Sequence, residues 1–260
     1  LEPDRGLLNS GYIYDFFKQT SLDLCREVLA ATGQPVGEGP IHERDERAMR
    51  YLFVLQKFVD GMQQVKHGGC ILMVPEGTTR QSLKETVTVK YPCRDVTTWN
   101  CLRGKSILYE RFYRGREMGE AGQHKGQDLV DLQSEMADVE HGLRDSLDAL
   151  VRFTAVDGAV LMTRRFELLG FGTVVRLSQA AHQAQYKVCR CKDRQATTPE
   201  PITIEDYGTR HRSAFEFCHS SPSPSVAFVA SQDGGIKTVT GVRNHVYFWE
   251  NMSFDLSAEG

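Results

Sequence analysis

The sequence lacks the excess of basic residues that marks a protein coating nucleic acid. It has 31 Lys and Arg against 34 Asp and Glu, a net charge of −3 over 260 residues, whereas a nucleic-acid coat presents a strongly basic surface. It also lacks any apolar run approaching the ~20 residues of a membrane span, and no signal-peptide pattern stands at its start. We therefore expect a cytoplasmic protein without a membrane span. Because the chain begins at Leu1 rather than Met, we also expect upstream segments to be missing.

Cysteine is present, but not in the pattern of a disulfide framework or a zinc site. An odd number of cysteines in a chain large enough to build its own core predicts reduced thiols. Cys189 and Cys191 are separated by one residue, yet no second Cys or His pair stands at zinc-site spacing, so plain thiols are favoured over a metal site. The seven are Cys25, Cys70, Cys93, Cys101, Cys189, Cys191 and Cys218.

The first 66 residues predict a helical extension. Thr20 and Asp23 resemble a capping box that begins a helix, and Gly33 is expected to end it. Apolar residues between Met49 and Val65 then recur on one helical face, ahead of a Gly-Gly pair. We expect residues 1–66 to form this extension and residues 67–260 to form the main domain.

From residue 70 onward, strand patterns alternate with helical ones. Apolar or alternating runs predict strands at 70–74, 86–91, 159–162, 167–175, 225–230 and 236–240, with a hairpin turn at 233–235. Steps of three and four predict helices over 127–151 and 210–219. Residues 106–113 fit a strand or a helix, and the glycine-rich stretch 115–126 predicts an exposed loop. The fold class is therefore α/β, a mixed central sheet flanked by helices, with the N-terminal helical extension.

The most informative segment opens a predicted helix and combines two arginines with a histidine. Helix-start N–H groups and the helix dipole attract phosphate, and the arginines offer forked donors. A hydroxyl and an imidazole add further hydrogen-bonding groups. An N-capped surface helix with solvated basic residues is the alternative, although arginines in a first turn oppose the dipole and favour an anion nearby. The segment is Gly208-Thr209-Arg210-His211-Arg212.

A second segment, Asp157-Gly158-Ala159, precedes a buried strand. Two residues with almost no side chain let a flat ligand approach the backbone, while the carboxylate holds a divalent cation or a hydroxyl. Taken alone, a plain Asp-Gly turn between helix and strand is the simpler interpretation.

Together the two segments resemble the diadenylate cyclase domain family, also known as the nucleotide-binding domain of the DNA-integrity scanning protein DisA. A Gly-Cys-Ile-Leu-Met-Val strand upstream resembles the opening strand of the family. A Val-Ala-Phe-Val-Ala-Ser-Gln-Asp-Gly-Gly strand and turn downstream resembles its closing hairpin. The resemblance covers about residues 67–241.

The resemblance implies an enzyme that condenses two ATP molecules into cyclic di-AMP with release of two pyrophosphates, assisted by Mg²⁺ or Mn²⁺. Each protomer would bind one ATP, and two protomers would meet face to face. Asp157 would bind the metal and activate the 3′-hydroxyl, Gly158 and Ala159 would line the nucleoside, and Ser231 would contact phosphate. The triphosphate would be held by Gly208, Thr209, Arg210, His211 and Arg212.

The sequence also departs from the family pattern. Val156 stands where some members have a His that helps bind the metal, and Gln232 where some have a Glu. These differences keep a second hypothesis open, in which the domain has weak or no catalytic activity and senses a nucleotide or cyclic dinucleotide to regulate an effector. A chance motif on an unrelated α/β fold is the third.

Overall fold

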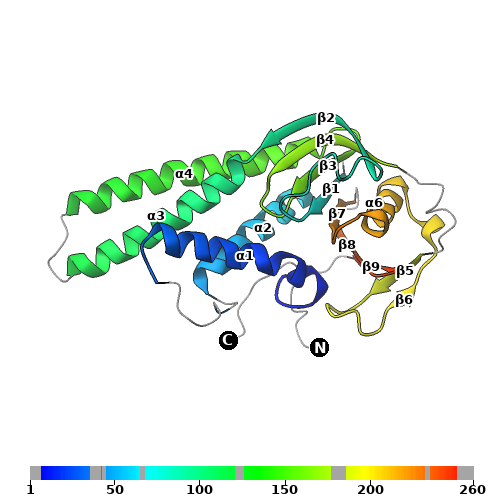
Figure 1. Cartoon of the computed structure of the whole chain (residues 1–260), viewed down its shortest axis with the longest axis horizontal. Helices are drawn as coiled ribbons and strands as arrows, with labels where there is room; N and C mark the ends of the chain where they lie inside the picture. The colour runs from blue at the N-terminus through cyan, green and yellow to red at the C-terminus, as the bar shows by residue number, and fades with distance from the viewer. Residues whose placement is uncertain are drawn as a thin grey trace.

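The computed structural model describes residues 7–35, 42, 45–64, 68–120, 126–176, 186–231 and 235–250. These residues form one nine-stranded sheet with helices on both faces (Figure 1). The strands are β1 (Gly69–Val74), β2 (Val87–Asp95), β3 (Ala159–Thr163), β4 (Leu168–Val175), β5 (Lys187–Cys191), β6 (Glu200–Pro201), β7 (Val226–Ala230), β8 (Ile236–Val242) and β9 (His245–Glu250). The helices are α1 (Gly11–Ala31), α2 (Glu46–Gln64), α3 (Thr97–Glu120), α4 (Gly126–Phe153) and α6 (Thr209–Ser220), with a 3₁₀ turn, η1 (Ile204–Asp206). The expected α/β class is confirmed.

The sheet is mixed, and β1 lies in its interior. The strands follow the order β2-β4-β3-β1-β7-β8-β9-β5-β6. β1 pairs in parallel with β3 and antiparallel with β7, and β5 pairs in parallel with β9. All six residues of β1 are buried, as its unbroken apolar run predicts.

Successive residues of β1 point to opposite faces of the sheet, and each face has its own hydrophobic core. Ile71 and Met73 belong to the larger core, which residues of α1, α2, α3 and α4 complete. Cys70, Leu72 and Val74 belong to a second core under α6. In Figure 1, α6 lies on the opposite side of the strands from the other four helices. The helix that opens with the arginine-rich segment therefore has one face of the sheet to itself among the described helices.

The first two helices bury their apolar faces in the core of the sheet. Phe17 of α1 stacks on Phe228 of β7 with ring centroids 6.2 Å apart, and Tyr12 stacks on Tyr247 of β9 at 5.2 Å. Burying a large apolar side chain contributes about 1.5–3 kcal/mol. The domain border at residue 66 stays a prediction, whereas the packing makes α1 and α2 a layer over the sheet.

The expected helix start at Thr20 and Asp23 is wrong. α1 begins at Gly11, and the apolar stripe already starts with Ile13, so Thr20 lies buried in the middle of the helix. Its hydroxyl donates to Oε1 of Glu76 at 2.5 Å instead of capping the helix. The expected end is confirmed, because the helix stops at Ala31 and Gly33 takes a φ of +65°.

α3 and α4 form an antiparallel hairpin that projects from the sheet (Figure 1). At 1.5 Å per residue, their 24 and 28 residues reach about 36 and 42 Å. The undecided stretch 106–113 is helical, and the loop expected from residue 115 is wrong as far as Glu120. Gly115 faces the partner helix, since a Cβ there would lie 3.0 Å from Cδ2 of Leu129. Its missing side chain lets the two helices pack closely, while residues 121–125 lie outside the described residues.

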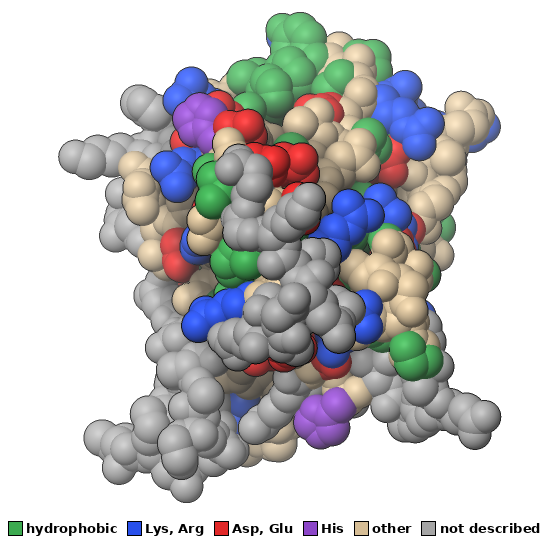
Figure 2. Space-filling view, turned by 90° about the vertical axis from the view of Figure 1, so that its left-hand side faces the viewer, with side chains coloured by type: hydrophobic (Ala, Val, Ile, Leu, Met, Phe, Trp, Pro, Cys, Tyr) green, Lys and Arg blue, Asp and Glu red, His purple; other side chains and the backbone are tan. Residues whose placement is uncertain are grey.

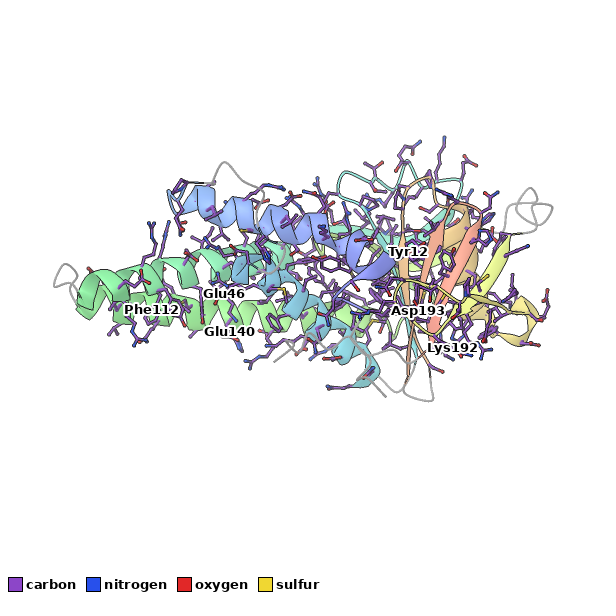
Figure 3. All side chains as sticks on the ribbon, turned by 90° about the horizontal axis from the view of Figure 1, so that it is seen from below. Tyr12, Glu46, Phe112, Glu140, Lys192 and Asp193 are labelled. Atoms are coloured by element: carbon purple, nitrogen blue, oxygen red, sulfur yellow. The ribbon has the colours of Figure 1, made fainter. Side chains whose placement is uncertain are left out.

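Side chains along the hairpin and around the sheet are shown in Figure 3, where Phe112 lies far out on the hairpin and Tyr12 beside the strands. On the face at the hairpin end of the molecule, acidic and basic side chains are interspersed among the described residues (Figure 2).

None of the helices among the described residues combines the length and the apolarity needed to cross a bilayer. All seven cysteines are free thiols, as expected.

A partly buried ionic network fixes α1 to the sheet. Glu76 follows β1 and Arg164 follows β3, and their side chains form an ion pair. Arg164 also donates from Nη1 to the Phe16 carbonyl at 2.7 Å, and its own carbonyl accepts from the Tyr51 hydroxyl at 2.7 Å. Because Thr20 donates to the same carboxylate, Glu76 connects α1, β1 and β3.

The substitution Glu76→Ala is expected to lower the free energy of unfolding by about 2–3 kcal/mol, because it leaves the charge of Arg164 without its carboxylate. The Arg164 side chain is only 15% exposed. Urea denaturation measures the change. Glu200→Ala, which removes the exposed partner of Lys192, is the matched control and should leave the curve unchanged. Equal effects of the two substitutions would show that the network does not fix α1.

Candidate functional site

Three chain segments meet at one end of the central strands. β1 and β3 run in parallel, with Ile71 opposite Val160, so both strands begin at the same edge of the sheet. β7 runs the other way and ends there, with Ala230 opposite Gly69. The register therefore places three segments together at this end of the strands: the turn before β3, the glycines at the start of β1, and Ser231 after β7. This end of the central strands is called the edge below.

The turn that carries Asp157 is held against β1 and β4 by close contacts at two glycines. A Cβ on Gly69 would lie 2.7 Å from Cβ of Thr154, at the end of α4. A Cβ on Gly158 would lie 2.7 Å from the carbonyl carbon of Gly172 in β4, and Gly158 has a φ of +105°. Glycine is therefore required at residue 158 for both space and conformation. Asp157 itself is exposed, and Ala159 is buried toward the core under α6.

The first turn of α6 is open to a ligand. Gly208 caps the helix in extended conformation, no side chain caps the first N–H groups, and no acidic residue lies in the first turn. Of the residues that the structure describes, none beyond its chain neighbours has an atom within 4 Å of a Cβ built on Gly208. Thr209, Arg210 and Arg212 are exposed. Uncapped N–H groups beside two cations form an anion-binding arrangement.

Arg210 extends from α6 to the start of β1, the strand that pairs with β3. A Cβ on Gly68 would lie 3.0 Å from Nη1 of Arg210 and 3.1 Å from the carbonyl oxygen of Ala230. The guanidinium therefore lies over the start of β1, beside the end of β7. The structure thus brings Arg210 to the edge that carries Gly158 and Ser231, although about 50 residues separate the motifs in sequence.

His211 lies half-buried behind the arginines. Its ring centroid lies 5.8 Å from that of Tyr207 and 6.4 Å from that of Phe248. Burial, followed by the nearby charges of Lys237 and Arg210, lowers the pKa of His211 from 6.5 to about 4. Its Nε2 is buried and has no hydrogen-bond partner in the described part of the chain. At neutral pH the imidazole is therefore uncharged, and it offers a hydrogen bond rather than a positive charge.

Tyr207 is a residue that the sequence patterns do not identify as part of the site. Its ring packs edge-to-face on Phe215 at 5.6 Å and on Phe248 at 5.3 Å, and its hydroxyl lies 3.5 Å from Oε1 of Glu250. Tyr207 thereby fixes the chain immediately before Gly208. The sequence signal that could have identified Tyr207 is its aromatic side chain, directly before Gly208.

The described residues offer a metal ion few ligands of their own. No group of three His, Cys, Asp or Glu side chains gathers within the described ranges. Asp157 lies at the edge, and Asp233 lies outside the described residues. Mg²⁺ is commonly held by one or two carboxylates together with substrate phosphates. The donor set therefore fits an ion that arrives with a polyphosphate.

Cys189 and Cys191 are buried thiols on β5. Burial raises the pKa of both, that of Cys191 to about 12. Because metal binding requires thiolates, the interpretation as plain thiols is favoured.

Comparisons with known proteins include structural matches at low sequence identity. No protein-family model matches the sequence, and the curated proteins contain no match either. A crystal structure of a double mutant of DacA from Staphylococcus aureus is 11% identical, with 81% of this chain and 91% of that chain covered and a TM-score of 0.40. A hypothetical membrane spanning protein from Bacillus cereus is 12% identical, with 89% of each chain covered and a TM-score of 0.37. Likeness at this level assigns no function, so function has to be inferred from this chain's own residues.

Gly158→Ala is expected to destabilise the fold by about 2–4 kcal/mol, through a strained φ and a clash with the β4 backbone. Gly77→Ala is the matched control, since Gly77 has a φ of +78° but open space around it, and it should cost only about 1 kcal/mol. Urea denaturation of both variants separates the clash from the strain. Similar losses would mean that β3 and β4 do not approach closely at this turn.

The pKa of His211 predicts how stability depends on pH. The unfolded chain binds a proton near pH 6.5 and the folded chain only near pH 4, so the free energy of unfolding should fall as the pH drops through this window. His211→Asn should flatten that dependence between about pH 6.5 and 4. Urea denaturation across the window measures it, and identical slopes for variant and wild type would contradict the burial of a neutral imidazole.

Proposed function

We propose that this protein is a diadenylate cyclase that condenses two ATP molecules into cyclic di-AMP and two pyrophosphates. The observation that carries the proposal is the position of Arg210, whose guanidinium lies over the start of β1. The register places the Asp157-Gly158-Ala159 turn at this edge. Nucleotidyl transfer requires a group that binds the phosphates and a carboxylate close to the nucleoside. The first turn of α6 and the Asp157 turn are these two parts.

Each part of the ATP molecule has a matching surface. The uncapped N–H groups of α6 bind the triphosphate together with Thr209, Arg210 and Arg212, and the neutral His211 adds one hydrogen bond. Ser231, at the end of β7, contacts phosphate from the other side. Gly158 and Ala159 receive the nucleoside, because neither carries a side chain that would hold it away from the backbone.

Asp157 acts on the reacting hydroxyl. The 3′-oxygen of one ATP forms a bond to the α-phosphorus of the other, and the bond from that phosphorus to the pyrophosphate oxygen breaks. Asp157 accepts the hydrogen bond of the 3′-hydroxyl, whose proton then passes to solvent. Asp157 and the triphosphate would hold Mg²⁺ or Mn²⁺, which would neutralise the developing negative charge. Two such transfers close the ring.

The reaction needs two protomers. One set of site residues binds one ATP, so the second nucleotide must come from a facing chain. The exposure of Asp157, Thr209, Arg210 and Arg212 allows two edges to face each other around a pair of nucleotides. The free thiols of all seven cysteines suit a reducing compartment, and we place the enzyme in the cytoplasm.

A sensor that binds the nucleotide without turnover is the second candidate. It is favoured by the sparse donor set, since no three metal-binding side chains gather anywhere among the described residues. Calorimetry with ATP and with cyclic di-AMP separates the candidates: tight binding of the cyclic product without synthesis supports the sensor.

Incubation with ATP and Mn²⁺, followed by mass spectrometry, is expected to yield cyclic di-AMP. Asp157→Asn should lower the rate about 100-fold or more, because the 3′-hydroxyl loses its carboxylate, and it should remain folded because residue 157 is exposed. Asp148→Asn, at an exposed position on α4, is the matched control with full activity. No product from folded wild-type protein across metals would refute the cyclase, and full activity of Asp157→Asn would refute the assigned role.

A further inference from the structure

Lys237 lies beside the proposed phosphate site, although no motif includes it. It is the second residue of β8, opposite Val229 of β7 and Glu250 of β9. Val229 and Val239 both belong to the core under α6, and side chains two residues apart share a face. Lys237 therefore faces α6, one residue from the edge where β7 ends and Ser231 follows.

The carboxylate opposite Lys237 is engaged elsewhere. Glu250 lies with Oε2 3.6 Å from Nε of Arg190 and with Oε1 3.5 Å from the Tyr207 hydroxyl. Lys237 forms no ion pair with a carboxylate within the described part of the chain, and the same holds for Arg210 and Arg212. Arg210 and Lys237 thus lie near one edge without a described counter-ion, and Arg212 is exposed in the first turn of α6.

We propose that Lys237 binds the phosphates of the nucleotide and, with Arg210 and Arg212, makes the site selective for triphosphates over monophosphates. This inference rests on the proposed function. Arg210 and Arg212 reach the ligand from the first turn of α6, and Lys237 reaches it from the sheet beneath. A compact ammonium on a flexible stem can follow a phosphate chain as a point charge. A triphosphate carries more negative charge than the single phosphate of AMP, so cations along the phosphate chain stabilise it more.

The position of His211 supports this arrangement. Its pKa is lowered by the charges of both Lys237 and Arg210, in addition to burial, so the imidazole lies near both cations. Its buried Nε2 has no hydrogen-bond partner among the described residues, so the uncharged imidazole has an unused hydrogen-bonding group. The ring contacts with Tyr207 and Phe248 hold it there.

Calorimetry with ATP and with AMP, each with Mg²⁺, tests the proposal. Lys237→Gln should weaken ATP binding about tenfold and AMP binding by less than about threefold, since a charge-assisted contact to the outer phosphates is lost. Lys187→Gln, at an exposed position on β5, is the matched control and should bind both nucleotides as wild type does. Lys237→Arg should restore most of the affinity for ATP.

Amine acetylation of the wild-type protein followed by mass spectrometry needs no variant. ATP should protect Lys237 and leave Lys187 as reactive as before. If wild type binds ATP but Lys237→Gln binds it equally well and Lys237 is not protected, the role of Lys237 is wrong while the nucleotide site stands. If folded wild type binds neither ATP nor inorganic tripolyphosphate, the proposed function itself fails.

Discussion

The pairing of β1 with β3 on one side and β7 on the other determines where every part of the proposed site lies. This register brings the start of β3, the start of β1 and the end of β7 to one edge. Contacts of Gly69 with Thr154 and of Gly158 with Gly172 leave no room for a bulkier residue there. A slip of one residue would turn each strand's side chains to the opposite face and separate the Asp157 turn from α6. Packing of the central strands is therefore the condition for any chemistry at this edge.

Local charge, rather than net charge, describes what the edge can bind. The chain as a whole is slightly acidic, yet Arg210 and Lys237 lie near one edge while the nearby Glu250 turns to Arg190. His211 remains neutral because burial and two neighbouring cations disfavour its protonation. The open first turn of α6 adds oriented N–H groups to these cations. A small polyphosphate meets both requirements, whereas a long polyanion would need a basic surface that the chain lacks.

The sequence predicts the parts of the fold whose residues interact locally, and it fails where tertiary contacts decide. Apolar runs correctly predict β1, β3 and β7, since fully buried strands need no polar alternation. The start of α1 is missed because Thr20 resembles a cap, while in the fold its hydroxyl binds Glu76. The helix beyond Gly115 is missed because a glycine suggests a loop until the close approach of α4 is known. No pattern predicts β5 and β9, which complete the far half of the sheet.

The same division holds for the site. The two contiguous motifs could be identified from residue types, because their local spacing carries the chemistry. Tyr207 and Lys237 could not, since their relation to the motif arises only when β8 and β9 pair beneath α6. The identity of Arg210 was available from the sequence, but its place over Gly68 was not.

A crystal structure of the protein with a non-hydrolysable ATP analogue and Mg²⁺ measures most directly whether this edge is a nucleotide site. The account predicts the phosphates against the first turn of α6, within reach of Arg210 and Lys237, and the nucleoside against Gly158 and Ala159. A nucleotide bound elsewhere, or an empty edge at saturating analogue, would contradict it.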